Sequence, residues 1–264
     1  GIASRGLGDV YKRQHKINDY RNNGPELPVW QVITESSNLG TARIAKMIGP
    51  EKQREFLSSL GFTKPTSIEM IEASGGKPLL PRRWNELETM TISYGHGLSA
   101  TPLHLATGYA TLANGGRLVK PTLLEEEKLG LGQQIISQEV AKNSLAMLRG
   151  VVTEGTASLA DVNGYFVAGK TGTADKPSAQ GGYDKEKNIT SFASIFPVHE
   201  PKYVLVVTLD EAQDTSGPEP KRTAGWTAVP VSAEIIARVA PLLGLRPKFD
   251  NKSSVGVTLS NWQE

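Results

Sequence analysis

The sequence contains no cysteine, which excludes disulfides, thiolate nucleophiles and zinc-thiolate sites and leaves the redox compartment open. Long hydrophobic runs are also missing: the longest, near Tyr203–Leu209, is far shorter than the roughly 20 residues of a membrane-spanning helix. No basic or apolar leader follows Gly1, so the sequence shows no signal peptide. We therefore expect a globular fold that is part of a longer protein.

Charges of one sign do not gather along the chain. The 29 Lys and Arg nearly balance the 27 Asp and Glu, and no long basic run indicates a nucleic-acid partner. The four histidines are scattered without H-E-x-x-H spacing, so we expect no metal site. With 264 residues, 38% of them hydrophobic, the chain is long enough for one large core or two modest domains.

The first residues have no clear periodicity. Within them Asp9–Gln14, "DVYKRQ", can be back-translated into DNA that resembles the transposon end used to build sequencing libraries. We interpret residues 1–14 as translated adapter, with a disordered natural terminus as the alternative. Authentic sequence is then expected from about His15.

Several segments have the apolar spacing of helices. One helix is predicted after the Ser-Ser-Asn at 36–38, ending at Gly49, and Pro50 suits the first turn of a second that runs to about Leu60. Residues 62–86, rich in Pro, Gly and Ser, are typical of an irregular connection. Three further helices are predicted: one that Thr101 caps and Gly115 ends, one over Ser137–Val152, and one over Val229–Leu245.

Strand-like runs fill much of the C-terminal half. They are Tyr165–Ala174, Ile189–Pro197 and Lys202–Asp210, with a polar loop over residues 175–188 between the first two. Neighbouring runs joined by turns predict an antiparallel meander. The expected fold class is therefore α/β of the α+β type, with an antiparallel sheet flanked by helices, and residues 246–264 are expected to form a flexible tail.

One stretch, "GYFVAGKTGTADK" at Gly164–Lys176, fits two motifs. Its first eight residues match G-x-x-x-x-G-K-[ST], the phosphate-binding loop, and its middle reads K-T-G-T, a signature of penicillin-recognising enzymes. A phosphate-binding loop leads from flexible residues directly into a helix. Here "YFV" favours a strand where the loop should be, and "GTADKPSAQGG" cannot begin a helix. We therefore reject the nucleotide-binding interpretation.

The remaining interpretation is a strand centred on K-T-G-T. The missing side chain at Gly172 would let an extended ligand pair along this strand. Lys170 would then hold a carboxylate together with the hydroxyls of Thr171 and Thr173. Taken alone the motif is weak, because any exposed strand can carry these four residues.

A second motif makes the first more specific. Ser36 and Asn38 form S-x-N at the start of a predicted helix, although helix capping is an alternative role for both residues. Together with three longer blocks, the ordered pair resembles class B, division-type penicillin-binding proteins over most of His15–Leu245. The blocks are "TISYGHGLSATPLHLATGYATLANGG", "VVTEGTASLADVNGYFVAGKTGTADK" and "TAVPVSAEII". The resemblance implies that residues 15–245 are a partial transpeptidase domain of the penicillin-binding-protein/β-lactamase-like fold, incomplete at the N-terminus.

The resemblance also implies a chemistry. In this family a serine attacks the D-Ala-D-Ala end of a peptidoglycan stem peptide and passes the acyl group to an amine. Ser36 would relay a proton, and Asn38 would hydrogen-bond the substrate amide and orient the catalytic lysine. Lys170 would complement the terminal carboxylate with the help of Thr171, while the N–H of Thr173 would be an oxyanion-hole donor.

Partners and location follow from the same resemblance. Stem peptides and β-lactam antibiotics are the implied ligands, and no metal or organic cofactor is implied. The intact parent protein would belong to a membrane-bound division complex on the periplasmic face of the inner membrane.

The nucleophile motif of the family, S-x-x-K, does not precede S-x-N in this sequence. Ser4 is followed at the required spacing by Leu7, and the one S-x-x-K match, Ser74 to Lys77, lies after S-x-N with two glycines inside it. We therefore expect this chain to be catalytically inactive as given. The alternatives are a non-catalytic muropeptide- or β-lactam-binding module and a D,D-carboxypeptidase-like hydrolase.

Overall fold

The chain divides into two compact units, Gly1–Ser137 and Gln138–Glu264. The structure is a computed structural model that describes residues 2–3, 17–24, 26–125, 131–178 and 182–249. Of the predicted adapter segment, only Ile2–Ala3 lies within the described residues. Each unit is described by itself below.

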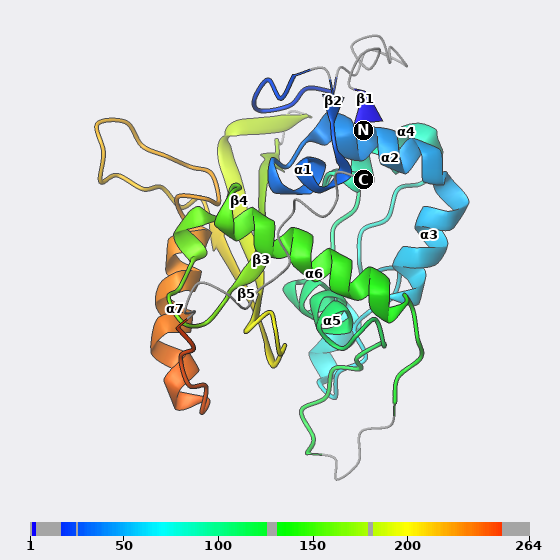
Figure 1. Cartoon of the computed structure of the whole chain (residues 1–264). Helices are drawn as coiled ribbons and strands as arrows, with labels where there is room; N and C mark the ends of the chain where they lie inside the picture. The colour runs from blue at the N-terminus through cyan, green and yellow to red at the C-terminus, as the bar shows by residue number, and fades with distance from the viewer. Residues whose placement is uncertain (1, 4–16, 25, 126–130, 179–181, 250–264) are drawn as a thin grey trace. The chain divides into compact units, whose positions relative to one another are not determined.

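The first unit is mainly helical (Figure 1). Its elements are β1 (Ile2–Ala3), β2 (Glu26–Leu27), α1 (Val29–Thr34), α2 (Asn38–Ile48), α3 (Pro50–Ser59), the 3-10 helix η1 (Ile71–Gly75), α4 (Glu86–Ser93) and α5 (Pro102–Ala113). The two short strands pair antiparallel. The predicted helices α2, α3 and α5 are confirmed, including the stop at Gly49 and the cap at Thr101, whose side chain accepts from the N–H of His104.

Two helices of this unit were not predicted, α1 and α4. The six residues of α1 are too few for a helical period to be visible. A local signal for α4 does exist, since the side chain of Asn85 accepts from the N–H groups of Leu87 and Glu88. This cap lies within the segment that its Pro and Gly content had marked as irregular.

The second unit contains the predicted meander. Its elements are α6 (Gln138–Thr153), the 3-10 helix η2 (Ser158–Ala160), β3 (Ala168–Pro177), β4 (Tyr183–Phe196), β5 (Tyr203–Asp210) and α7 (Ala228–Leu242). The strands form an antiparallel sheet in the order β3-β4-β5, and α6 and α7 pack against it (Figure 1). The expected antiparallel sheet flanked by helices is therefore confirmed.

The first predicted strand, Tyr165–Ala174, begins and ends later in the structure, as β3. Phe166 has a φ of 44°, in the left-handed region, and the carbonyl of Val167 accepts from Arg149 of α6 at 2.8 Å, so β3 begins only at Ala168. At the other end, β3 and β4 extend across a bulge at Asp175/Lys176 into the predicted polar loop. The predicted loop over 175–188 was too long, because backbone pairing between polar residues carries β3 to Pro177 and starts β4 at Tyr183.

The core of the second unit lies around β4. The run Phe192–Phe196 is at most 3% exposed, so both faces of this central strand are covered. Val151 and Val152 of α6 and Ile236 of α7 are also buried. Burying each of these large side chains contributes about 1.5–3 kcal/mol, so the helices and β4 hold the sheet together.

The described part of the predicted tail contacts the segment before β3. The N–H of Lys248 donates to the carbonyl of Gly164 at 2.9 Å, and a Cβ on Gly164 would lie 2.6 Å from Pro247. Residues 250–264 of the predicted tail lie outside the described residues.

Two glycines of β3 differ in what surrounds them, and this predicts unequal effects of an added methyl group on stability. A Cβ at Gly169 would lie 2.5 Å from the carbonyl oxygen of Ala193 and 2.7 Å from the ring of Phe192, whereas a Cβ at Gly172 would meet no atom within 4 Å. Gly169→Ala should therefore lower the free energy of unfolding by about 1–3 kcal/mol. The matched Gly172→Ala variant should change it by less than about 0.5 kcal/mol. Urea denaturation of the two variants checks this, and equal losses would contradict it.

Candidate active-site motifs

The S-x-N motif lies at a tight turn between α1 and α2 in the first unit. Ser36 has a φ of 56° and is exposed, and its N–H donates to the carbonyl of Ile33. The next N–H, of Ser37, donates to the carbonyl of Val32 at 3.0 Å. Gly40 permits this turn, since a Cβ there would lie 2.6 Å from the side chain of Val32. The left-handed residue reverses the chain within a few residues and leaves Ser36 at the surface.

Helix α2 is capped by Ser37, the residue between the two predicted site residues. The Oγ of Ser37 accepts from the N–H of Gly40 at 2.9 Å and donates to Oδ2 of Asp19 at 2.8 Å. The other oxygen of Asp19 accepts from the N–H of Leu39 at 2.9 Å. The capping alternative considered for Ser36 and Asn38 is therefore not what the structure has.

The side chain of Asn38 also makes a hydrogen bond, but to the backbone rather than to Asp19. Its Nδ2 donates to the carbonyl of Asn18 at 3.1 Å, so the segment before β2 braces both residues of the turn that follow Ser36. Asp19 was not predicted as a site residue, because nothing in the polar residues around it indicates a contact with a helix about twenty positions away.

In the second unit, K-T-G-T lies within β3, as predicted. The Nζ of Lys170 donates to the carbonyl of Thr171 at 3.1 Å and lies 3.5 Å from its Oγ1. Burial of the ammonium lowers the pKa of Lys170 to about 8. The charged amine and the Thr171 hydroxyl therefore lie together, which suits a pair that holds an anion.

The rest of the motif faces outward. Gly172 and Thr173 are exposed, and β3 pairs only with β4 among the described strands, so its other edge carries no strand. Thr171 Oγ1 bonds Thr156 Oγ1 at 2.8 Å, and Thr173 Oγ1 accepts from the N–H of Ala224 at 3.0 Å. Neither Thr156 nor Ala224 had been singled out in the sequence.

The nucleotide-binding alternative is not what the structure has. Gly169, Lys170 and Thr171 lie inside a strand that leads to another strand, β4, rather than to a helix. A phosphate-binding loop needs the N–H groups at a helix start to face the phosphates.

The lone S-x-x-K match begins in η1 with Ser74 and ends beyond it with Lys77. Ser74 and Lys77 are both exposed, and the Oγ of Ser74 donates to the carbonyl of Ile71 at 3.0 Å. A serine bonded to a backbone carbonyl on a single 3-10 turn lacks the activation that a neighbouring amine supplies.

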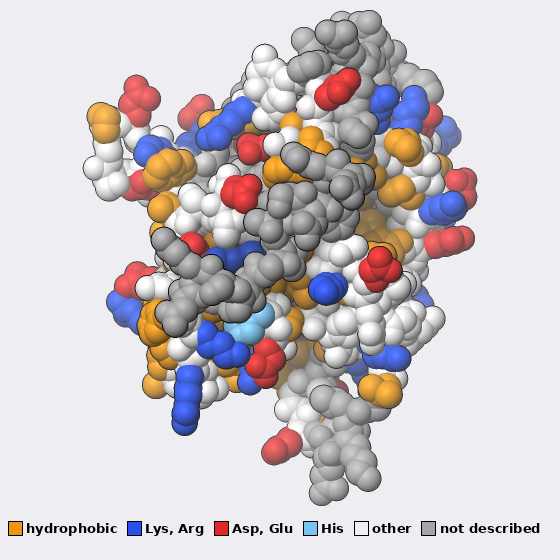
Figure 2. Space-filling view, viewed as in Figure 1, with side chains coloured by type: hydrophobic (Ala, Val, Ile, Leu, Met, Phe, Trp, Pro, Cys, Tyr) orange, Lys and Arg blue, Asp and Glu red, His pale blue; other side chains and the backbone are white. Residues whose placement is uncertain are grey.

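The described residues show no feature that indicates a membrane span or a metal site, and their charges are mixed. No described helix combines the length and apolar character that a membrane crossing needs. Within the same part of the chain, no cluster of three or more His, Asp or Glu could hold a metal ion. On the face in Figure 2, Lys and Arg are interspersed with Asp and Glu, as expected from the nearly balanced totals.

Comparison with known proteins identifies the family. Residues 5–236 match the model of the penicillin binding protein transpeptidase domain, so the chain belongs to this family. A probable peptidoglycan D,D-transpeptidase FtsI of Caulobacter vibrioides is 33% identical over 254 residues, covering 92% of this chain and 43% of that protein. The chain thus spans less than half the length of this curated relative.

Solved structures agree on the fold. The transpeptidase domain of penicillin-binding protein 3 from Burkholderia pseudomallei has a TM-score of 0.76 and 31% identity, covering 86% of this chain and 67% of that one. Penicillin-binding protein 3 from Mycobacterium tuberculosis, complexed with ampicillin, has a TM-score of 0.76 and 25% identity, covering 89% and 56%. The transpeptidase fold expected from the sequence is confirmed.

Ser37 is buried and makes two side-chain hydrogen bonds, so replacing it should cost more stability than replacing Ser36. Ser37→Ala should lower the free energy of unfolding by about 1–2 kcal/mol, since the Gly40 N–H loses its partner and Oδ2 of Asp19 keeps only the donor from Asn23. Ser36→Ala, at an exposed position, should change it by less than about 0.5 kcal/mol. Thermal and urea unfolding measure both, and a larger loss at Ser36 would show that the cap is assigned to the wrong residue.

Proposed function

We propose that this chain carries the ligand-binding part of a peptidoglycan D,D-transpeptidase, which recognises the D-Ala-D-Ala end of stem peptides. The observation that carries the proposal is the exposed backbone at Gly172, on a strand edge next to the half-buried Lys170. A peptide can pair with such an edge through main-chain hydrogen bonds, and its carboxylate can pair with the amine.

The reaction of the intact protein has two acyl transfers. A serine oxygen attacks the carbonyl of the penultimate D-Ala, the peptide bond breaks, and terminal D-Ala leaves as an amine that has taken a proton. The amine of a neighbouring stem peptide then attacks the ester, and the serine regains its proton. β-Lactams imitate the dipeptide, and the ampicillin complex of the mycobacterial relative supports this ligand class.

The predicted residues have the following roles in this proposal. Ser36 relays the proton to the leaving amine, and Asn38 hydrogen-bonds the substrate amide and orients the catalytic lysine. Lys170 holds the terminal carboxylate with the help of Thr171 and Thr173. The N–H of Thr173 is one oxyanion-hole donor, a contact whose loss typically costs about 2.7–4 kcal/mol of transition-state stabilisation.

The intact parent protein works, in this proposal, within a division complex on the periplasmic face of the inner membrane. The support is the FtsI name of the Caulobacter relative.

The carboxylate assignment can be tested by binding, without turnover. We expect N-acetyl-D-Ala-D-Ala to bind about tenfold more tightly than its C-terminal amide, as judged by NMR shifts of β3 amides. Lys170→Gln should abolish this preference. Lys176→Gln is the matched control on the same strand, because hydrogen bonds to Asp210 and Glu211 hold that amine and raise its pKa.

The pH dependence has a definite sign. With a pKa of about 8, Lys170 is charged below that value, so the preference for the carboxylate should be present at pH 7. The preference should fall as the pH rises through and beyond 8, by at most tenfold per pH unit. Because the bound carboxylate favours the charged amine, the midpoint of this fall should lie above the pKa of the free chain. A preference that survives Lys170→Gln, or its absence in the wild-type chain, would refute the assignment.

The chain as given is proposed not to form an acyl-enzyme. No S-x-x-K precedes S-x-N among the residues of this sequence. Incubation with a fluorescent penicillin should leave no covalent label on the denatured chain. A label that disappears in Ser74→Ala would overturn the proposal and make Ser74 the nucleophile.

A further inference from the structure

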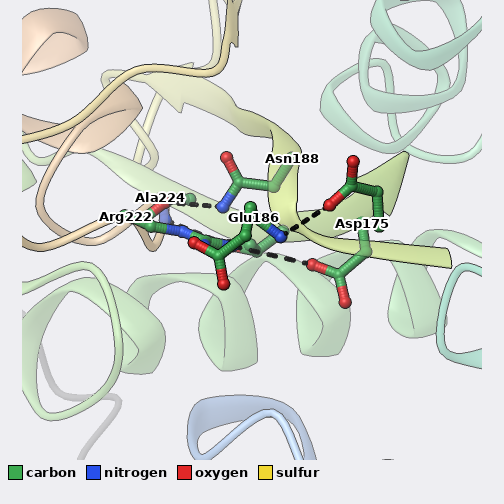
Figure 3. A network of polar contacts seen from close by, with 7 residues as sticks. Asp175, Glu186, Asn188, Arg222 and Ala224 are labelled. Atoms are coloured by element: carbon green, nitrogen blue, oxygen red, sulfur yellow. Dashed lines mark hydrogen bonds and ion pairs between the residues drawn. The ribbon is translucent and has the colours of Figure 1, made fainter. Parts of the chain in front are cut away.

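The loop between β5 and α7 lies on a polar face of the β3–β4 hairpin. Thr173 pairs across the strands with Thr190, and Asp175 pairs with Asn188, so these four side chains share one face. Each of them contacts the loop: Thr173 bonds the N–H of Ala224, Thr190 bonds Thr227 at 3.0 Å, and Asn188 and Asp175 contact Arg222. Figure 3 shows the part of this network around Arg222, with Asp175, Glu186, Asn188 and Ala224.

Asn188 ties the loop down at both ends. Its side-chain Nδ2 donates to the carbonyl of Arg222 at 3.1 Å, and its backbone carbonyl accepts from the N–H of Glu211 at 2.9 Å. Asn188 is only 3% exposed, so the amide bond to Arg222 is shielded from water.

The ion pairs around Arg222 hold the loop less firmly. The guanidinium lies 4.0 Å from Asp175 and 3.5 Å from Glu186, whose side chain is 88% exposed. Such long, solvated pairs contribute little to stability. Of the contacts between Arg222 and the β3–β4 hairpin, the bond from the buried amide of Asn188 is therefore the firmest.

The bond from Ala224 determines what the Thr173 hydroxyl can do. A threonine hydroxyl has one proton to donate and two lone pairs to accept with. Because Oγ1 of Thr173 accepts from the Ala224 N–H, its own proton must point elsewhere, and Thr173 is exposed on the strand next to Gly172. The hydroxyl is thereby set as a donor toward whatever pairs with β3.

We propose that Asn188 is a positioning residue for ligand binding: by holding Arg222 it places the Ala224 N–H, which orients the Thr173 hydroxyl as a donor to a ligand carboxylate. This inference rests on the proposed function, because the carboxylate is the ligand group assigned there. Asn188 itself does not touch the ligand.

The test combines amide hydrogen exchange with ligand discrimination on the full chain. In Asn188→Ala, the Ala224 amide should exchange at least about tenfold faster, because its loop loses the anchor. The preference for N-acetyl-D-Ala-D-Ala over its C-terminal amide should fall about threefold to tenfold, while affinity for the amide stays unchanged. A merely structural role would weaken both ligands alike. Asn188→Asp, which keeps the volume but removes the donor, should behave the same way and serves if the alanine variant does not fold.

Ser194→Ala is the matched control. Ser194 is a buried polar residue of the same strand, and its Oγ donates to the carbonyl of Leu205 at 3.1 Å, away from the loop. It should leave both the Ala224 exchange rate and the ligand preference unchanged.

The outcomes separate this inference from the proposed function. If the wild-type chain prefers the carboxylate and Asn188→Ala or Asn188→Asp keeps that preference, the inference is wrong and the function stands. Unchanged exchange at Ala224 in both variants also overturns it. If the wild-type chain shows no preference for the carboxylate, the proposed ligand site fails and the inference fails with it.

Discussion

The backbone pairing between β3 and β4 is the interaction on which the second unit depends. It attaches β3 to a central strand that is buried on both faces, and it leaves the K-T-G-T residues on an edge. The same register puts Thr173 opposite Thr190 and Asp175 opposite Asn188. One ladder therefore determines both the exposed edge and the face on which the β5–α7 loop is fixed. A slip of one residue would move these side chains to the other face.

In both motifs, residues that hold the backbone lie next to residues that are exposed. In S-x-N, the middle residue, Ser37, is buried and caps the helix, while Ser36 is exposed. In K-T-G-T, the amine of Lys170 is buried and Gly172 is open. A short motif can present reactive side chains at a surface only if adjacent residues hold its backbone in place. In S-x-N, Ser37 is such a residue.

Local signals predicted much of the fold, and contacts between distant residues account for what was missed. Caps, glycine stops and apolar spacing were sufficient for α2, α3, α5, α6 and α7, and β-branched runs for the three strands. The length of the β3–β4 hairpin was missed because it depends on backbone pairing of polar residues. Asp19 and Ala224 were missed for a related reason: each bonds a motif residue that lies far away in the sequence. The sequence motifs could be located from their residues, but these partners could not.

The open space at Gly172 has a consequence for how this position would change over generations. Folding sets no steric limit there, because an added methyl group would meet nothing, whereas Gly169 is confined by Ala193 and Phe192. Selection for a stable fold would therefore retain Gly169 in any descendant. Only selection for a bound partner would retain Gly172, so in a lineage released from that demand it would be the first letter of the motif to drift.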